Sequence, residues 1–80
     1  MRLDKYLKVT RIIKRRTVAN EACDAAHVTV NGRPAKASYD VKIGEILEVT
    51  FGARTLRIRV LEVKETVGKD AAASLYEVVE

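Results

Sequence analysis

The chain has 80 residues, 48% of them hydrophobic, and a net charge of +4, which predicts one small globular domain over residues 1–80. Its single cysteine excludes an internal disulfide, and this favours a reducing, cytoplasmic setting because small secreted domains usually need such crosslinks. No signal-peptide pattern is visible, and no apolar run approaches the roughly 20 residues that cross a bilayer. Nucleic acid and anionic membrane surfaces remain as partner classes for a basic chain of this kind.

The positive charge is concentrated at the start of the chain. The first 16 residues hold seven basic side chains and one acidic one, whereas the rest holds eight basic and ten acidic side chains. We call the seven cations the basic head: Arg2, Lys5, Lys8, Arg11, Lys14, Arg15 and Arg16. Such an uneven distribution indicates a binding partner more than it indicates a fold.

A short helix is predicted from about Leu3 to Val9. Leu3, Tyr6 and Leu7 recur at helical spacing and therefore share one face. Asp4 falls in the first turn, where the helix dipole favours an acid. We expect the apolar face of this helix to lie against the core.

A second helix is predicted to begin near Thr17 and to end around Ala26 or His27. The Thr17 hydroxyl is a suitable N-cap for a free amide of the first turn. A narrow face of small residues is suited to close packing: Val18, Ala22 and Ala26, with Ala19 and Cys23 beside them. Because no glycine follows, His27 or a neighbour must adopt the positive φ that commonly ends a helix.

From residue 28 the hydrophobic period changes from about 3.6 to about 2, which indicates strands. Asn31-Gly32 predicts a type I′ hairpin turn after a strand over 28–30, and Pro34 makes the return strand short or an edge. Strands are also predicted over 47–51, 56–60 and 75–79, with a hairpin turn at Gly52-Ala53 and loops over 35–42 and 66–74, the second with a helical turn at 71–73. The predicted fold class is α+β, with two N-terminal helices packed on a small antiparallel sheet.

No constellation for catalysis or metal binding is visible. The one histidine, His27, and the one cysteine, Cys23, are four residues apart, whereas a zinc site generally needs four such ligands. The small neighbours of Cys23 predict a buried side chain rather than a nucleophile. We therefore expect no enzymatic activity, no metal and no cofactor.

The basic head has two interpretations, a solvated charged helix surface or an anion-binding surface. Lys14, Arg15 and Arg16 directly precede the second helix, whose N-terminus is already partly positive, so each cation costs about 0.3–1 kcal/mol at low salt. A bound phosphate reverses that cost. Arg2 and the lysines of the first helix lie near the same turn. This arrangement favours a continuous surface for nucleic acid.

The four aromatic residues are too few for a platform that stacks single-stranded bases. Core packing is expected for Tyr6, Phe51 and Tyr76, whereas Tyr39 lies in a loop where it can stack on a base. Three further arginines lie in or near the predicted strand over 56–60: Arg54, Arg57 and Arg59. They either form a second, weaker RNA contact or protect a sheet edge from aggregation by their charge, and we favour the second interpretation.

Over about its first 50 residues the chain resembles the S-four RNA-binding domain, named after a ribosomal small-subunit protein. The resemblance is carried by these residues: Arg2-Leu3-Asp4-Lys5-Tyr6-Leu7, Arg11, Lys14-Arg15-Arg16-Thr17, the alanine-rich helix, Val28-x-Val30-Asn31-Gly32, Lys36, Ser38, Val41, Lys42 and Gly44-Glu45. It implies the alpha-L fold, with a core motif over about 1–50 and C-terminal strands over 51–80.

The whole length, including Phe51-Gly52 and the tail over 70–79, resembles the RqcP family, the stand-alone S-four proteins of bacterial ribosome-associated quality control. The resemblance implies binding to obstructed large (50S) ribosomal subunits, with contacts to rRNA and peptidyl-tRNA. It further implies cooperation with RqcH, which recruits alanyl-tRNA, in adding untemplated C-terminal alanine tails to stalled chains. One departure is His27, where related sequences tend to have glycine.

The same resemblance implies an RNA surface made of the basic head, with Lys36 and Lys42 at its margin. Arg2 and Arg16 are the strongest candidates, and we expect Arg2→Ala or Arg16→Ala to weaken ribosome association while the fold stays intact. We also expect a monomer.

Four alternatives stay open. The first is a heat-shock-type S-four ribosome-rescue protein, although the short tail argues against it. The second is a general rRNA-binding adaptor, and the third is a fragment of a pseudouridine synthase or RNA methyltransferase. A membrane-surface protein is the fourth, which the lack of a broad apolar face disfavours.

Overall fold

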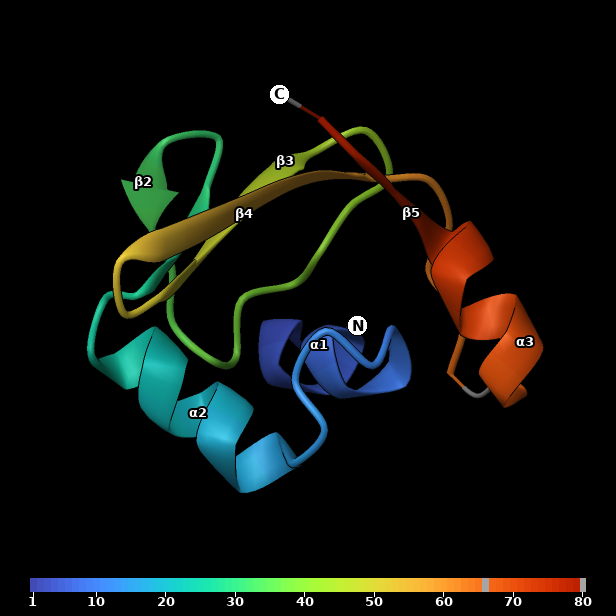
Figure 1. The fold of residues 1–80 in the computed structure, drawn as a ribbon, viewed down its shortest axis with the longest axis horizontal. Helices are drawn as coiled ribbons and strands as arrows, with labels where there is room; N and C mark the ends of the chain where they lie inside the picture. The colour runs from blue at the N-terminus through green and yellow to red at the C-terminus, as the bar shows by residue number, and fades with distance from the viewer. Residues whose placement is uncertain (66, 80) are drawn as a thin grey trace.

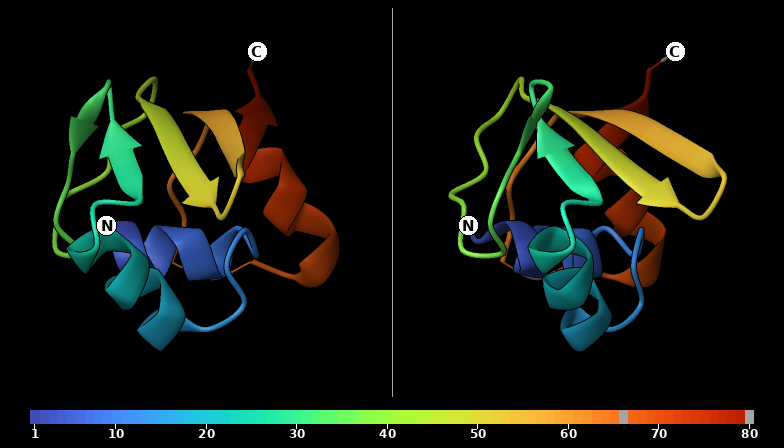
Figure 2. Two further views of the ribbon diagram at one scale, coloured as in Figure 1. Left: turned by 60° about the vertical axis from the view of Figure 1, so that its left-hand side comes forward. Right: turned by 90° about the vertical axis from the view of Figure 1, so that its left-hand side faces the viewer.

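The computed structural model describes residues 1–65 and 67–79, and its elements form two layers, a sheet over helices (Figures 1 and 2). In chain order they are α1 (Leu3–Val9), α2 (Arg16–Asp24), β1 (Val28–Val30), β2 (Arg33–Pro34), β3 (Ile46–Phe51), β4 (Arg54–Val60), α3 (Lys69–Ala72), the 3-10 turn η1 (Ala73–Leu75) and β5 (Tyr76–Val78). The predicted α+β class is confirmed. In the described part of the chain, no helix has the length and apolar character needed to span a membrane.

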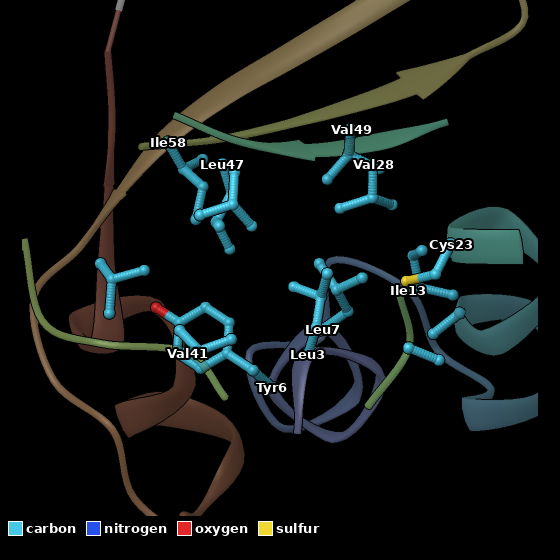
Figure 3. Close-up of a cluster of buried hydrophobic side chains, with 14 residues drawn as sticks. Leu3, Tyr6, Leu7, Ile13, Cys23, Val28, Val41, Leu47, Val49 and Ile58 are labelled. Carbon is cyan, nitrogen blue, oxygen red and sulfur yellow. The ribbon is translucent and has the colours of Figure 1, made fainter. Parts of the chain in front are cut away.

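The core lies between α1 and the inner face of the sheet, as Figure 3 shows. Leu3, Tyr6 and Leu7 are fully buried, which confirms the helical face predicted from their spacing. They meet strand residues that alternate along the sheet, among them Leu47 and Ile58, which are direct partners across β3 and β4. Each fully buried aliphatic side chain of this kind contributes about 1.5–3 kcal/mol to folding.

The sheet has the order β2-β1-β3-β4-β5, and every neighbouring pair is antiparallel. Asn31 and Gly32 have φ values of 52° and 85°, which confirms the type I′ turn between β1 and β2. β2 contains Pro34 and lies at the sheet edge, as predicted. The edge is suitable because proline cannot donate to a ladder.

β4 is an open sheet edge, as predicted for the three arginines, only in its first part. The closing strand β5 pairs with Ile58–Val60, so Arg59 lies in a paired segment, whereas Arg54 lies before it. Arg57 and Arg59 instead form cross-strand ion pairs, with Glu48 at 3.5 Å and with Glu77 at 2.7 Å. The predicted edge is wrong for the later part of β4, because only the course of the chain after residue 60 decides which strand is outermost there.

The second helix begins one residue earlier than predicted, and Thr17 is not its N-cap. Arg15 occupies the cap position in an extended conformation (φ −118°, ψ 130°), and no side chain caps the helix. Thr17 is already inside the first turn and is exposed. The first-turn amides of α2 therefore lack the hydroxyl partner that the sequence suggested.

The packed face of α2 is narrower than predicted. Ala19 and Cys23 are buried, whereas 46% of Val18 is exposed. The chain leaves the helix through Ala26, whose φ of 60° supplies the positive value predicted for His27 or a neighbour. Ala19 and Cys23 belong to the same buried cluster as the apolar residues of α1.

The C-terminal segment returns along the far end of α1. α3 and η1 confirm the predicted helical turn within 66–74, while Thr66 lies outside the described residues. β5 confirms the closing strand at Tyr76–Val78. Phe51 was expected in the core, but 44% of it is exposed because the β3–β4 hairpin extends past the helical layer (Figure 2).

Candidate nucleic-acid interface

A hollow of about 770 Å³ opens at the corner where α1, the α1–α2 connection and the segment before α3 meet. We call it the corner hollow, and its lining residues are Lys5, Lys8, Val9, Arg11, Lys14, Arg16, Glu65 and Val67. Five of them are cations and one is an acid, Glu65, which pairs with Lys5. The structure thus brings together five residues of the basic head around one concave, positively charged space.

The connection between the two helices positions the cations that do not belong to a helix. Thr10, which is buried, donates its hydroxyl to the carbonyls of Tyr6 (2.9 Å) and Leu7 (3.2 Å). Arg11 follows with a φ of 63°, a left-handed conformation that is strained for any residue other than glycine. Ile13 then enters the core, with only 6% exposed. This tight turn directs Arg11 and Lys14 to the same hollow as the α1 lysines.

A buried carboxylate holds two arginines of the basic head. Asp4 is 2% exposed. Its Oδ1 accepts from Arg2 Nε at 3.1 Å, and its Oδ2 accepts from Arg2 Nη2 at 3.3 Å. Arg16 Nε lies 3.4 Å from Oδ2, and Asn20 Nδ2 donates to the same oxygen at 3.4 Å. We call these four residues the Asp4 clamp.

The clamp keeps Asp4 ionised. Burial alone raises the pKa of this carboxyl group, but the hydrogen bonds from Arg2, Asn20 and Arg16 outweigh burial and hold its pKa below 3.8. The two arginine side chains remain 49% and 46% exposed, so each is anchored at one edge and open to solvent at the other.

Two shallower depressions extend the cationic surface away from the corner hollow. Arg16 is shared between the hollow and a depression of about 490 Å³ around the clamp. Arg2 is shared between that depression and a groove of about 580 Å³ beside α2, which Lys36 also lines. Cations therefore follow one another from the hollow, past the clamp, to Lys36.

Of the nine predicted site residues, Arg15 and Lys42 line none of these three depressions. Arg15 is exposed directly before α2, between Lys14 and Arg16. Lys42 pairs with Asp40 at 2.6 Å, and Asp40 also accepts from the N-terminal amine. Lys42 and the amine lower the pKa of Asp40 to about 2.

Several cations are not neutralised within the protein. In residues 1–65 and 67–79, no ion pair involves Lys8, Arg11, Lys14 or Arg15. The first turn of α2 contains no acid. Unpaired cations beside the partly positive end of a nine-residue helix favour binding of a phosphate group.

Sequence reasoning missed three features of this surface. Asp4 was read only as a first-turn acid, and neither Asn20 nor Glu65 was given a role. The one available signal was that Asp4 is the single acid in the first 16 residues. Tyr39, considered for base stacking, is half-buried and donates its hydroxyl to Glu45.

Comparison with known proteins finds relatives over nearly the whole chain. The S4 domain model matches residues 1–47. The chain is 52% identical over 79 residues to the "RQC P-site tRNA stabilizing factor" of Streptococcus pneumoniae, covering 99% of this chain and 90% of that protein. It is 49% identical over 79 residues to the Bacillus subtilis protein of the same name, covering 99% and 92%.

A solved structure has the same fold. The structure described as trimeric Vibrio cholerae Heat Shock Protein 15 superposes with a TM-score of 0.92 at 30% sequence identity. The match covers 99% of this chain and 81% of that chain.

Proposed function

We propose a function for this chain from its family membership. The chain belongs to the S4-domain family and, within it, to the RQC P-site tRNA stabilizing factors. The resemblance seen in the sequence is thereby confirmed, and these relatives support a role in ribosome quality control. A non-enzymatic protein that binds RNA in the cytoplasm fits this premise.

The finer proposal concerns the target. The chain binds obstructed large ribosomal subunits that carry peptidyl-tRNA, contacts both rRNA and tRNA, and acts with RqcH while untemplated alanine is added to the stalled chain. The name of these relatives supports tRNA contact at the P site. The cooperation with RqcH and the alanine tailing follow from the family resemblance alone.

The observation that carries this proposal is the succession of cations from the corner hollow, past the Asp4 clamp, to Lys36. Lys8, Arg11 and Lys14 supply charge for phosphates, which gives affinity without reading sequence. The rigid α1–α2 corner presents these charges in a fixed arrangement, so the surface selects folded RNA by its shape. Lys42 remains a marginal contact in this proposal.

The test measures co-sedimentation with large subunits that carry peptidyl-tRNA. Lys14→Ala and Arg11→Ala are expected to weaken binding and to reduce its dependence on salt by about one ion for each lost phosphate contact. The matched control is Arg54→Ala, which removes the same charge at the exposed start of β4. Equal affinities for all three variants would overturn the assigned surface.

Arg2→Ala and Arg16→Ala are still expected to weaken association, but they are less direct probes. Each also removes a partner of the buried Asp4 carboxylate. Breaking a buried ion pair destabilises a fold because the remaining charge loses its compensation. The earlier expectation of an intact fold therefore needs a parallel measurement of unfolding for both variants.

A heat-shock-type rescue protein is the second candidate, favoured by the Vibrio cholerae structure. The match of this chain covers 90% of the Streptococcus protein but 81% of the heat-shock chain, which favours the quality-control factor. A reconstituted tailing reaction with RqcH distinguishes them, because only a quality-control factor stimulates alanine addition. Light scattering in the same buffer tests the proposed monomer against a trimer.

A further inference from the structure

We infer that Asp4 is a positioning residue for RNA binding, which holds Arg2 and Arg16 so that their free edges face one phosphate-binding surface. The inference rests on the proposed function and adds a residue whose charge is opposite to that of the surface. Its basis is the geometry of the Asp4 clamp, not the charge count of the basic head.

Asp4 engages only one edge of each guanidinium group. Arg2 donates through Nε and Nη2, while Arg16 approaches through Nε. The outer edge of each group is left for another acceptor, and about half of each side chain is exposed. An arginine held in this way presents a forked donor that matches the oxygens of a phosphate.

The carboxylate is itself held in place. The backbone amide of Lys5 donates to Oδ1 at 2.8 Å, and Asn20 donates to Oδ2 at 3.4 Å from the neighbouring helix. Asp4 is buried and therefore has no freedom to follow the arginines. It thus anchors Arg2, at the start of α1, and Arg16, at the start of α2, to one fixed point.

An asparagine at this position cannot replace the carboxylate. Its amide nitrogen is a donor, so it cannot accept from Arg2 Nη2, Arg16 or Asn20 as Oδ2 does. Arg16 would lose its contact with residue 4, and Arg2 would keep only the bond from Nε to the remaining oxygen. Both side chains would then regain rotamer freedom that RNA binding must remove again. The two effects of Asp4→Asn on RNA binding consequently have opposite signs. Loss of positioning weakens binding, whereas the removal of one negative charge strengthens binding to a polyanion.

The experiment compares Asp4→Asn with Asp24→Asn on large subunits carrying peptidyl-tRNA. Asp24 is exposed at the end of α2, where it lines the groove that Arg2 and Lys36 share, so its substitution makes the same change in charge on the same surface. We expect Asp4→Asn to bind about tenfold more weakly than the unsubstituted chain, and Asp24→Asn to bind no more weakly. The salt dependence of Asp4→Asn is expected to fall by about one to two ions, because Arg16 is released and Arg2 is held by one hydrogen bond instead of two.

The salt dependence of binding distinguishes positioning of the arginines from a purely structural role of Asp4. Loosening of the fold lowers the fraction of active protein without changing the number of ions released on binding. If Asp4→Asn binds as tightly as Asp24→Asn, or loses affinity with an unchanged salt dependence, the inference is wrong while the proposed function stands. If the unsubstituted chain does not bind these subunits, both fall.

A second variant keeps a positive charge beside Asp4 and therefore perturbs folding less than Asp4→Asn does. Arg16→Lys keeps the charge but removes the Nε that reaches Asp4, at a side chain that is half exposed. We expect a several-fold loss of affinity, against no loss for Arg54→Lys at the start of β4. Equal affinities for the two lysine variants would contradict positioning by Asp4.

Discussion

The hydroxyl of Tyr6 in α1 donates a hydrogen bond of 2.8 Å to the backbone carbonyl of Leu75, 69 residues further along the chain. The same carbonyl accepts from the amides of Leu61, at 2.9 Å, and Glu62, at 3.1 Å. Figure 3 shows the Tyr6 ring within the core, with its hydroxyl oxygen turned toward the C-terminal segment. We therefore propose that the motif over 1–50 and the strands over 51–80 unfold together.

Replacing Tyr6 with phenylalanine is expected to lower the free energy of unfolding by about 1 kcal/mol, the typical net value of one buried hydrogen bond. Burial raises the pKa of the Tyr6 hydroxyl, so it remains a donor at neutral pH. Urea unfolding followed by circular dichroism measures the loss, and Tyr76→Phe, at a half-buried ring, is the control. Two separate transitions, or equal losses in both variants, would contradict the link.

Arg11 allows charge and backbone strain to be separated. Because its φ is 63°, glycine at this position relieves strain that alanine retains. We expect Arg11→Gly to be more stable than Arg11→Ala by about 0.5–1 kcal/mol, after the entropy of glycine in the unfolded chain is counted. RNA affinity should fall equally in both variants, since both lose the same cation. Thermal unfolding and co-sedimentation of the pair test the two statements independently.

Lowering the pH should reduce the stability of the fold by protonating Asp4. Its folded pKa lies below 3.8, so its contribution to stability is complete above pH 3.8 and is lost as the pH falls through the folded value. Asp4→Asn should therefore be less stable at neutral pH and decline less steeply below pH 3.8. Urea midpoints along a pH series measure this slope, with Asp24→Asn as the control. A parallel decline in Asp4→Asn and the unsubstituted chain would show that Asp4 does not carry the effect.

Cys23 should report opening of the α2 interface. The side chain is 4% exposed, and burial, with the nearby Asp4 and Asp24 carboxylates, raises the pKa of its thiol to about 11. Alkylation by iodoacetamide needs the thiolate, so the native chain should react slowly and reactivity should rise with the unfolding transition. Rapid modification without denaturant would show that α2 separates from the core in the native state.

Local patterns in the sequence determined much of this protein. The spacing of Leu3, Tyr6 and Leu7 sets the buried face of α1, and Asn31-Gly32 sets the first hairpin. Both depend only on backbone geometry and nearby side chains, which near neighbours in the chain specify. The concentration of cations in the first 16 residues likewise located the surface that lines the corner hollow.

Tertiary structure alone decided the rest. Asp4 meets Asn20 across 16 positions, and no periodicity relates Arg2 to Arg16. The exposure of Phe51 depends on how far the helical layer extends beneath the hairpin. Ion pairs and burial depend on which distant segments pack together, so a buried acid that organises two cations becomes visible only when α1 and α2 are placed side by side.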